Sequence, residues 1–236
     1  MASNSAPLPV QPFAEPVIGT AEADVVTALH TSVYAELRHR LLTGRIIPGV
    51  GLSTRGLAQE LGVSQMPVRE ALSRLAAERA VEIRSKRRIV VPPMTRERFD
   101  DLLRCRVLLE PEAARQALPM IDPKRLRRLK EIDDHMEVCL QNGDVHGYMA
   151  GNLDFHFTIY RAQPRETLIQ LIEILWLQFG PFMRVVYGRF GTANLIDQHQ
   201  VALRAIEKKD ADALAKAIAS DIEDGMRLIG TAGLEG

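Results

Sequence analysis

A glycine between two short helical segments limits the folds open to this chain more than any other feature. In the run LAQELGVSQMPVREALSRL, Gly62 ends one segment, Val63 follows it, and Ser64 precedes the next segment. A tight turn needs a residue that tolerates positive φ and a buried apolar residue beside it, and serine is a common helix N-cap. The run therefore predicts a helix-turn-helix with helices over 54–61 and 65–78.

The second helix of this motif has a buried and an exposed face. Apolar residues recur from Val68 to Leu75 at the three- and four-residue steps of a buried stripe. On the opposite face, glutamine and arginine reach base edges or phosphates when such a helix lies in the major groove of DNA. The residues predicted to face DNA are Ser64, Gln65, Met66, Arg69 and Ser73.

Further cationic residues surround the motif. A helix is predicted from Asp24 to Leu42, and the alternating segments VEIR and RIVV predict a β-hairpin, which completes a winged helix. Nearby arginines should bind phosphates, and the hairpin tip should lie along the backbone or in the minor groove. These residues are Arg38, Arg40, Arg45 and Arg55 for the phosphates and Lys86, Arg87 and Arg88 for the tip.

Charge is unevenly distributed along a chain whose net charge is zero. Residues 25–93 carry a balance of +6, whereas residues 1–24 and 94–236 carry −3 each. A basic segment joined to an acidic remainder is typical of a polyanion-binding module fused to a domain with another task. We therefore expect double-stranded operator DNA as a partner. We also expect a homodimer, because one winged helix rarely holds a specific site alone.

Proline and helix signals divide the chain into parts. Residues 1–24 hold four prolines and little periodicity, which predicts a disordered tail. The winged helix covers 25–91, and Pro92-Pro93 opens a linker over 92–95. Only helical patterns follow, so an antiparallel all-helical bundle is predicted over 96–230 and the fold class is mainly α. The predicted helices are 96–117, 123–142, 145–161, 165–188, 193–208 and 211–229, with N-caps at Thr95, Asp122, Asp144 and Asp210.

Composition bears on the compartment and on the cysteines. No stretch has the roughly 18 consecutive apolar residues of a membrane span, and the first residues lack the pattern of a signal peptide. We therefore expect a cytoplasmic protein with no membrane partner. Cys105 and Cys139 lie far apart without a C-x-x-C spacing, which favours reduced thiols over a disulfide or a zinc knuckle.

Polar side chains interrupt the apolar stripes of the predicted bundle. Arg106 lies at core spacing on its first helix, and Asn152 and His156 lie one turn apart on its third. His199 and Asp221 fall in the stripes of the last two helices, nearly level with each other. A buried polar group without a partner costs about 1 to 3 kcal/mol, so we expect these side chains to converge.

The chemistry of such a cluster leaves alternatives open. Two imidazoles, a carboxylate and an amide oxygen are compatible with a divalent-metal site, and Arg106 beside them suits an anion. The same residues also fit a metal-free hydrogen-bond network or a solvent-filled cavity that receives only a ligand. The stripes alone favour these metal-free alternatives.

The N-terminal run YAELRHRLLTGRIIPGVGLSTRGLAQELGVSQMPVREALSRL resembles the DNA-binding domain of the GntR family of regulators. In that family three arginines contact operator DNA alongside the wing. The resemblance assigns the arginine of VREAL to Arg69 and the first arginine to Arg45 or Arg55. The chain departs from the pattern at Gln65, where the family has arginine, and at Arg88, where it has a wing-tip glycine.

The segments CRVLLEPEAARQA, NLDFHFTIY and QHQVALRAIEKKDADALAKAIASDI resemble the FCD ligand-binding domain of the FadR subfamily. The resemblance implies a divalent metal, such as zinc, nickel or manganese, and a carboxylate effector held by Arg106. Asn152 stands where the family has aspartate, and Asp221 stands where it has histidine, so weaker binding or a harder ion is expected. The implied metal ligands are Asn152, His156, His199 and Asp221.

Together these features predict a ligand-responsive, DNA-binding transcription regulator and not an enzyme. A metalloenzyme with a two-histidine, one-carboxylate site is an alternative. It is disfavoured because such chemistry has no use for a basic winged helix, and no further catalytic acid or base is evident. A DNA-architectural protein with a purely structural helical domain is a second alternative, which the polar residues in the helical stripes disfavour.

Overall fold

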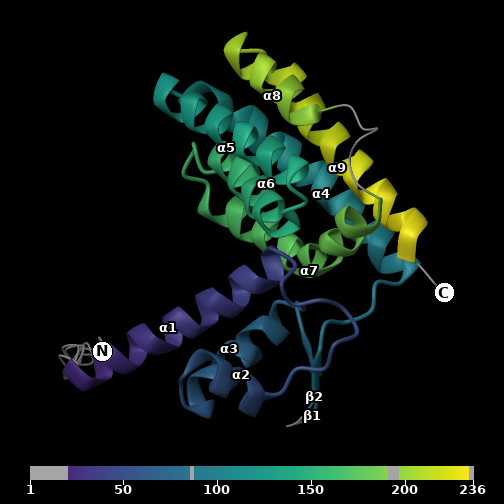
Figure 1. Ribbon diagram of the computed structural model, residues 1–236. Coiled ribbons are helices and arrows are strands. Elements are labelled where there is room, and N and C mark those ends of the chain that lie inside the picture. The colour runs from purple at the N-terminus through teal and green to yellow at the C-terminus, as the bar shows by residue number, and fades with distance from the viewer. Residues whose placement is uncertain (1–20, 86–87, 191–196, 234–236) are drawn as a thin grey trace, which may run out of the picture.

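The computed structural model describes residues 21–85, 88–190 and 197–233, which form a small N-terminal head and a larger helical bundle (Figure 1). Nearly all regular structure in these ranges is helical, which confirms the predicted mainly α fold class. The head contains α1 (Ala21–Leu42), α2 (Thr54–Leu61), α3 (Gln65–Ala77), β1 (Glu82–Ser85) and β2 (Arg88–Val90). The bundle contains α4 (Arg96–Ala117), the 3-10 helix η1 (Leu118–Met120), α5 (Pro123–Gln141), α6 (Val145–Tyr160), α7 (Glu166–Phe190), α8 (Gln198–Glu207) and α9 (Ala211–Gly233).

The chain differs from the sequence prediction in several places. Helix α8 begins at Gln198 rather than at residue 193, because Asp197 has an extended backbone and caps it, and α9 continues to Gly233 rather than ending at residue 229. The first helix begins at Ala21 rather than Asp24, so the last residues assigned to the tail are helical, as alanine and glutamate favour. The 3-10 turn η1 after α4 was not predicted. Residues 1–20 of the predicted tail and 191–196 before α8 lie outside the described residues.

The turn between α2 and α3 has the geometry that its glycine predicts. Gly62 adopts φ +66°, and its N–H bonds to carbonyls at the end of α2. Ser64 has the extended backbone of an N-cap, but its hydroxyl makes no capping hydrogen bond. The buried stripe of α3 packs on α1 and α2 and thereby fixes which face of α3 remains exposed.

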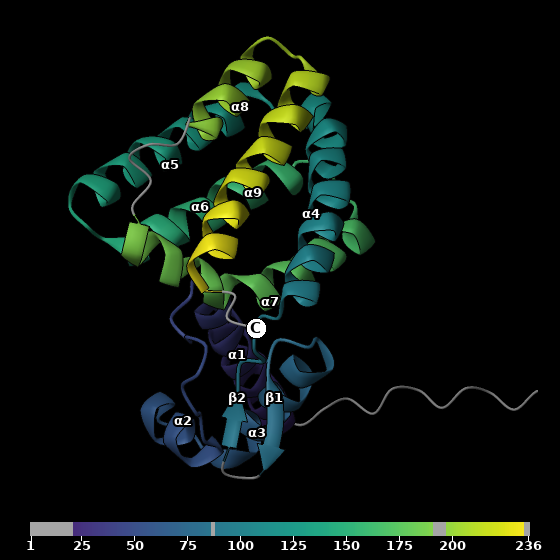
Figure 2. The ribbon, with the colours of Figure 1, turned by 90° about the vertical axis from the view of Figure 1, so that its right-hand side faces the viewer.

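The β-hairpin is anchored to the rest of the head. β1 and β2 pair antiparallel, and Leu52, in the loop before α2, exchanges two backbone hydrogen bonds with Ile89 of β2. Ile89 is almost fully buried in the head. The hairpin, α2 and α3 therefore form one winged-helix unit below the bundle (Figure 2).

The bundle encloses a core whose largest buried side chains include Trp176, Tyr160 and Phe155. Helix α9 packs along α4 and α8, and α6 packs on α5. Each N-cap predicted in the bundle accepts a hydrogen bond from the backbone N–H three residues later. These caps are Thr95, Asp122, Asp144 and Asp210.

The head contacts the bundle through the end of α1 and the middle of α7. Gly180 permits this approach, because a Cβ atom there would lie 2.7 Å from the carbonyl oxygen of Leu41 and 2.8 Å from that of Leu42. Arg98 of α4 adds a polar contact with the head by donating from Nη2 to the carbonyl oxygen of Arg79 at 3.4 Å. Within the described ranges, no helix combines the length and apolar composition that crossing a membrane requires.

Candidate functional site

The first candidate site is the exposed face of α3. Met66 keeps 58% of its surface exposed, and Gln65, Arg69 and Ser73 are exposed beside it. Within the described part of the chain, Arg69 has no side-chain hydrogen bond or ion pair. The face predicted to contact DNA is therefore open to a partner.

The other cationic residues of the head fall into two groups. Arg45, Arg55 and Arg88 are exposed, as a phosphate ligand must be. Lys86 and Arg87 of the predicted wing tip lie outside the described residues.

Arg38 and Arg40, which were predicted to bind phosphates, are paired with carboxylates in this structure. Arg38 pairs with Glu173 of α7 at 2.6 Å, and Arg40 pairs with both Glu36 and Glu60 at 2.6 Å. Their guanidinium groups are already neutralised by carboxylates, one of which lies in the bundle.

The second candidate site lies inside the bundle, where three of the four predicted metal ligands meet. Nε2 of His156 lies 3.1 Å from Oδ2 of Asp221, and Nε2 of His199 lies 3.7 Å from Oδ1 of Asp221. One potential ligand atom from each residue lies within 4.8 Å of the other two. Helices α6, α8 and α9 each supply one of them.

Burial differs among the residues of this site. His156 and His199 are buried, whereas Asp221 keeps 27% of its side chain exposed, so the site meets solvent on the α9 side. Asn152, the fourth predicted ligand, is buried one turn before His156 on α6. Aromatic rings pack against the imidazoles. The ring centroids of Phe155 and His199, for example, lie 4.5 Å apart.

Charge and burial set the protonation of the site. Burial lowers the pKa of His199, although Asp221 opposes this shift. Burial alone would raise the pKa of Asp221, but His199, His156 and Arg106 together lower it to about 2. The site therefore presents an ionised carboxylate beside the neutral imidazole of His199, which is the state that binds metal ions.

Nε2 of His199 is a buried nitrogen without a hydrogen-bond partner among the described residues. On the other side of the ring, Nδ1 lies 3.7 Å from Oδ1 of Asp133, and the other oxygen of that carboxylate, Oδ2, accepts a hydrogen bond from Gln200. Burial and then Asp197 raise the pKa of Asp133 to about 6. Asp133 and Asp197 form a second cluster with His199.

The sequence predicts that Arg106 holds an effector carboxylate, and the structure pairs it with a carboxylate of its own helix. It is 3% exposed and donates from Nε to Oε1 of Glu110 at 2.6 Å and from Nη2 to Oε2 at 3.3 Å. Its guanidinium also stacks over the rings of Trp176 and Phe179. A carboxylate of the chain itself thus occupies the position expected for an effector carboxylate.

Sequence reasoning missed three residues that surround this arginine. Glu110 is fully buried, and its Oε2 accepts from the Tyr160 hydroxyl and from Nε1 of Trp176, each at 2.9 Å. Tyr160 also lies 2.9 Å from Nδ1 of His156. The available signal was the spacing of Glu110, four residues after Arg106 on the same helical face.

Comparison with known proteins assigns both parts of the chain. Residues 29–91 match the model of the bacterial regulatory proteins of the gntR family, and residues 101–224 match the FCD domain. With the winged-helix head, these matches define a transcription regulator with a helical C-terminal domain. The chain belongs to the GntR family of regulators, in the group that carries an FCD domain.

Relatives agree with this assignment. The HTH-type transcriptional regulator McbR of Escherichia coli K12 is 29% identical over 205 residues, covering 86% of this chain and 93% of that protein. The gluconate operon transcriptional repressor of Bacillus subtilis 168 is 26% identical over 201 residues, covering 80% of each chain. The solved structure of E. coli McbR/YncC has a TM-score of 0.80 at 28% identity, covering 86% of this chain and 97% of that one. These relatives are regulators rather than enzymes, as predicted.

Proposed function

We propose that this GntR-family regulator binds operator DNA through the exposed face of α3, and that a small ligand bound in the bundle changes its affinity for DNA. The observation that carries the ligand proposal is the buried Nε2 of His199, which has no hydrogen-bond partner among the residues that the structure describes and lies 3.7 Å from Asp221. An unpartnered buried nitrogen is costly, so its place beside a second imidazole and an ionised carboxylate supports a bound cation.

The spacing of the three residues suits one divalent ion. Nitrogen and oxygen ligands with bonds of about 2.0–2.2 Å lie roughly 3 to 3.5 Å apart around one ion. The separations of Asp221 from His156 and His199, 3.1 and 3.7 Å, are close to that range. His156, His199 and Asp221 would hold zinc, nickel or manganese, with Asn152 as the fourth ligand. The bound ion would offer open positions to a small carboxylate effector.

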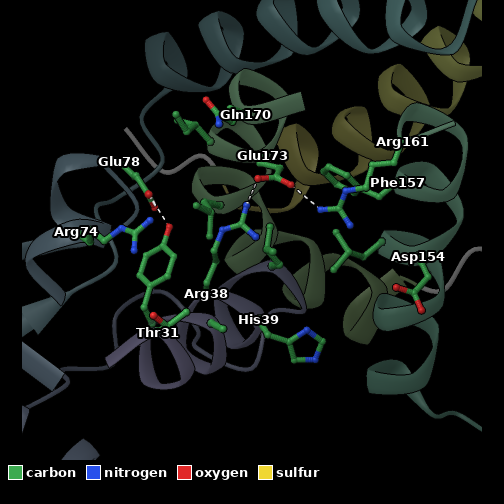
Figure 3. Close-up of a pocket in the computed structure, with 16 residues that line it drawn as sticks. Thr31, Arg38, His39, Arg74, Glu78, Asp154, Phe157, Arg161, Gln170 and Glu173 are labelled. Atoms are coloured by element: carbon green, nitrogen blue, oxygen red, sulfur yellow. Dashed lines mark hydrogen bonds and ion pairs between the residues drawn. The ribbon is translucent and has the colours of Figure 1, made fainter. Parts of the chain in front are cut away.

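Helix α7 provides a route from this site to the head. Trp176 of α7 donates to Glu110 beside the site, and three residues earlier Glu173 accepts from Arg38 of α1 at 2.6 Å. Glu173 also accepts from Arg161, which follows α6, at 2.5 Å (Figure 3). We propose that a shift of α6 or α7 on ligand binding alters the pairing at Glu173 and thereby the position of the head.

A cavity of about 740 Å³ separates the head from the bundle around this carboxylate. Figure 3 shows that Arg38 and Arg161 each point toward Glu173, one from the head and the other from the bundle. The cavity gives the head room to move relative to α7, because these ion pairs rather than continuous packing span this part of the contact.

The direct test of the ligand proposal is calorimetric titration of the metal-free protein with zinc, nickel or manganese. We expect one ion per chain, and we expect His156→Ala to lower its affinity at least tenfold by removing one ligand. His135→Ala, which removes an exposed histidine of α5, is the matched control and should bind like the wild type. Absence of binding by the wild-type protein would refute the metal site.

We also propose that the regulator acts in the cytoplasm as a homodimer. Helix-turn-helix proteins commonly read two half-sites with two-fold symmetry, because one recognition helix contacts few base pairs. Light scattering at micromolar concentration should therefore give twice the chain mass of 26.3 kDa. A mass equal to one chain would contradict the dimer.

A further inference from the structure

We infer that the cavity between the head and the bundle is a second ligand site, which binds a zwitterionic α-amino acid with an apolar side chain. Its walls come from α1 and α3 of the head and from α6 and α7 of the bundle. The volume of about 740 Å³ lies in the usual range of small-molecule sites. None of the four proposed metal ligands lines this cavity, so the inference goes beyond the proposed function.

One open group of this site is a buried carboxylate oxygen. Glu78 follows the last residue of α3, and its Oε1 accepts from the Tyr34 hydroxyl at 2.6 Å. Its Oε2 is buried and has no hydrogen-bond partner among the described residues. A buried acceptor without a donor is costly. An ammonium group in the cavity would supply the donor, because it carries three N–H groups and a positive charge.

The second open group is the guanidinium of Arg74, one turn earlier on α3. It lies 3.9 Å from the centroid of the Tyr34 ring and makes no hydrogen bond or ion pair with a described residue. Arg38 and Arg161, by contrast, both pair with Glu173 (Figure 3). Among the arginines that line the cavity, Arg74 is therefore the one open to a ligand carboxylate, which a guanidinium can bind with two hydrogen bonds.

The charged side chains around the cavity balance one another. Three arginines and three carboxylates line it, namely Arg38, Arg74, Arg161, Glu78, Asp154 and Glu173. A ligand with a net charge therefore gains no attraction from the cavity as a whole, whereas the two ends of a zwitterion match the two open groups. Because side chains four residues apart on a helix are neighbours, the two charges of the ligand must also be close, as those of an α-amino acid are.

The bundle side of the cavity suits an apolar side chain. Leu153 and Phe157 of α6 and Leu177 of α7 line it and are buried. The ligand would thus bind the head through its charged groups and the bundle through its side chain. A ligand that binds only one arrangement of two parts stabilises that arrangement. An amino acid in the cavity should therefore hold the head in the orientation that the structure shows.

The test is calorimetric titration of the metal-free protein with L-leucine, L-methionine, L-phenylalanine and L-tryptophan. Metal-free protein is used because amino acids chelate metal ions. We expect one bound molecule per chain. For the amino acid that binds most tightly, the analogue without the ammonium and the analogue without the carboxylate should each bind about 10- to 100-fold more weakly, since each loses a charged hydrogen bond. Absence of binding by all four at millimolar concentration, or equal binding by the analogues, would overturn the inference.

Two variants assign these losses to side chains. Glu78→Gln keeps an acceptor for Tyr34 but removes the negative charge, so the amino acid should lose its advantage over the analogue without the ammonium. Arg74→Met should remove the advantage over the analogue without the carboxylate. Glu70→Gln, which changes an exposed carboxylate of α3 outside the cavity, is the control and should bind like the wild type.

The two comparisons together leave a definite outcome. Equal binding of the amino acid by the wild type, Glu78→Gln and Arg74→Met would place the ligand elsewhere and overturn the inference. The comparison of analogues uses the wild-type protein alone, so it decides the question of a zwitterion site even if one variant fails to fold.

Discussion

Replacing Arg69 with alanine should lower operator affinity about 10- to 100-fold while leaving the fold intact. Arg69 is exposed on α3, and a bidentate arginine contact to a base is worth about 1 to 3 kcal/mol. Fluorescence anisotropy at several salt concentrations measures the loss. The salt dependence distinguishes a base contact from a phosphate contact. Only the loss of a phosphate contact reduces, by about one, the steepness with which the logarithm of the affinity falls against the logarithm of the salt concentration.

The matched control for Arg69→Ala is Arg128→Ala. Arg128 is an exposed arginine of α5 in the bundle, so its loss removes the same charge at a distance from the head. We expect Arg128→Ala to bind like the wild type. Equal binding by Arg69→Ala and the wild type would contradict the assignment of α3 as the recognition helix.

Replacing Glu110 with alanine should lower the free energy of unfolding by about 3 to 5 kcal/mol. The change leaves the Arg106 guanidinium buried without its carboxylate, and breaking a buried pair by removing one partner is strongly destabilising. Tyr160 and Trp176 lose an acceptor at the same time. Urea unfolding followed by circular dichroism measures the effect.

Two further variants define the cause of that loss. Glu112→Ala removes an exposed carboxylate of the same helix and should cost about 1 kcal/mol or less, since surface ion pairs contribute little. Arg106→Met combined with Glu110→Leu removes both buried charges and should recover much of the stability. A loss below about 1 kcal/mol for Glu110→Ala would contradict a buried, fully paired carboxylate.

The fold of the head follows from local rules, which is why the sequence predicts it well. Gly62 must adopt positive φ for the turn to close, and the stripe from Val68 to Leu75 determines the exposed face of α3. Leu52, by contrast, pairs with Ile89, which lies 37 residues later in the sequence, and no local sequence pattern predicts that β-bridge. The bundle helices were predictable because their caps and apolar periods are also local.

The candidate site was predictable only in part. His156, His199 and Asp221 stood out because each is a polar residue in an apolar stripe, and level helices bring them together. The roles of the arginines were harder to predict. Arg38 pairs with Glu173, 135 residues away, and Arg106 pairs within its own helix, so composition and position alone suggested phosphate and effector ligands. Which carboxylate an arginine meets is decided by tertiary packing.

Helix α7 contacts both the head and the residues beside the proposed ligand site. Trp176 and Glu173 lie one turn apart on α7, with the proposed ligand site next to Trp176 and the head next to Glu173. Because the two contacts belong to the same helix, we expect a displacement of Trp176 on ligand binding to change the position of Glu173. The Arg38–Glu173 pair is the contact whose loss should separate DNA binding from ligand response.

The measurement that tests this account most directly is operator affinity with and without metal. The operator is obtained by selection from random duplex DNA, and anisotropy is recorded for the metal-free and the zinc-loaded protein. We expect zinc to change wild-type affinity by about 5- to 150-fold, the usual range of coupling between sites. Glu173→Gln should bind both zinc and DNA with little coupling between them, whereas the exposed control Glu166→Gln should behave like the wild type. A wild-type protein that binds zinc at one site per chain and holds its operator equally tightly with and without zinc would contradict the account.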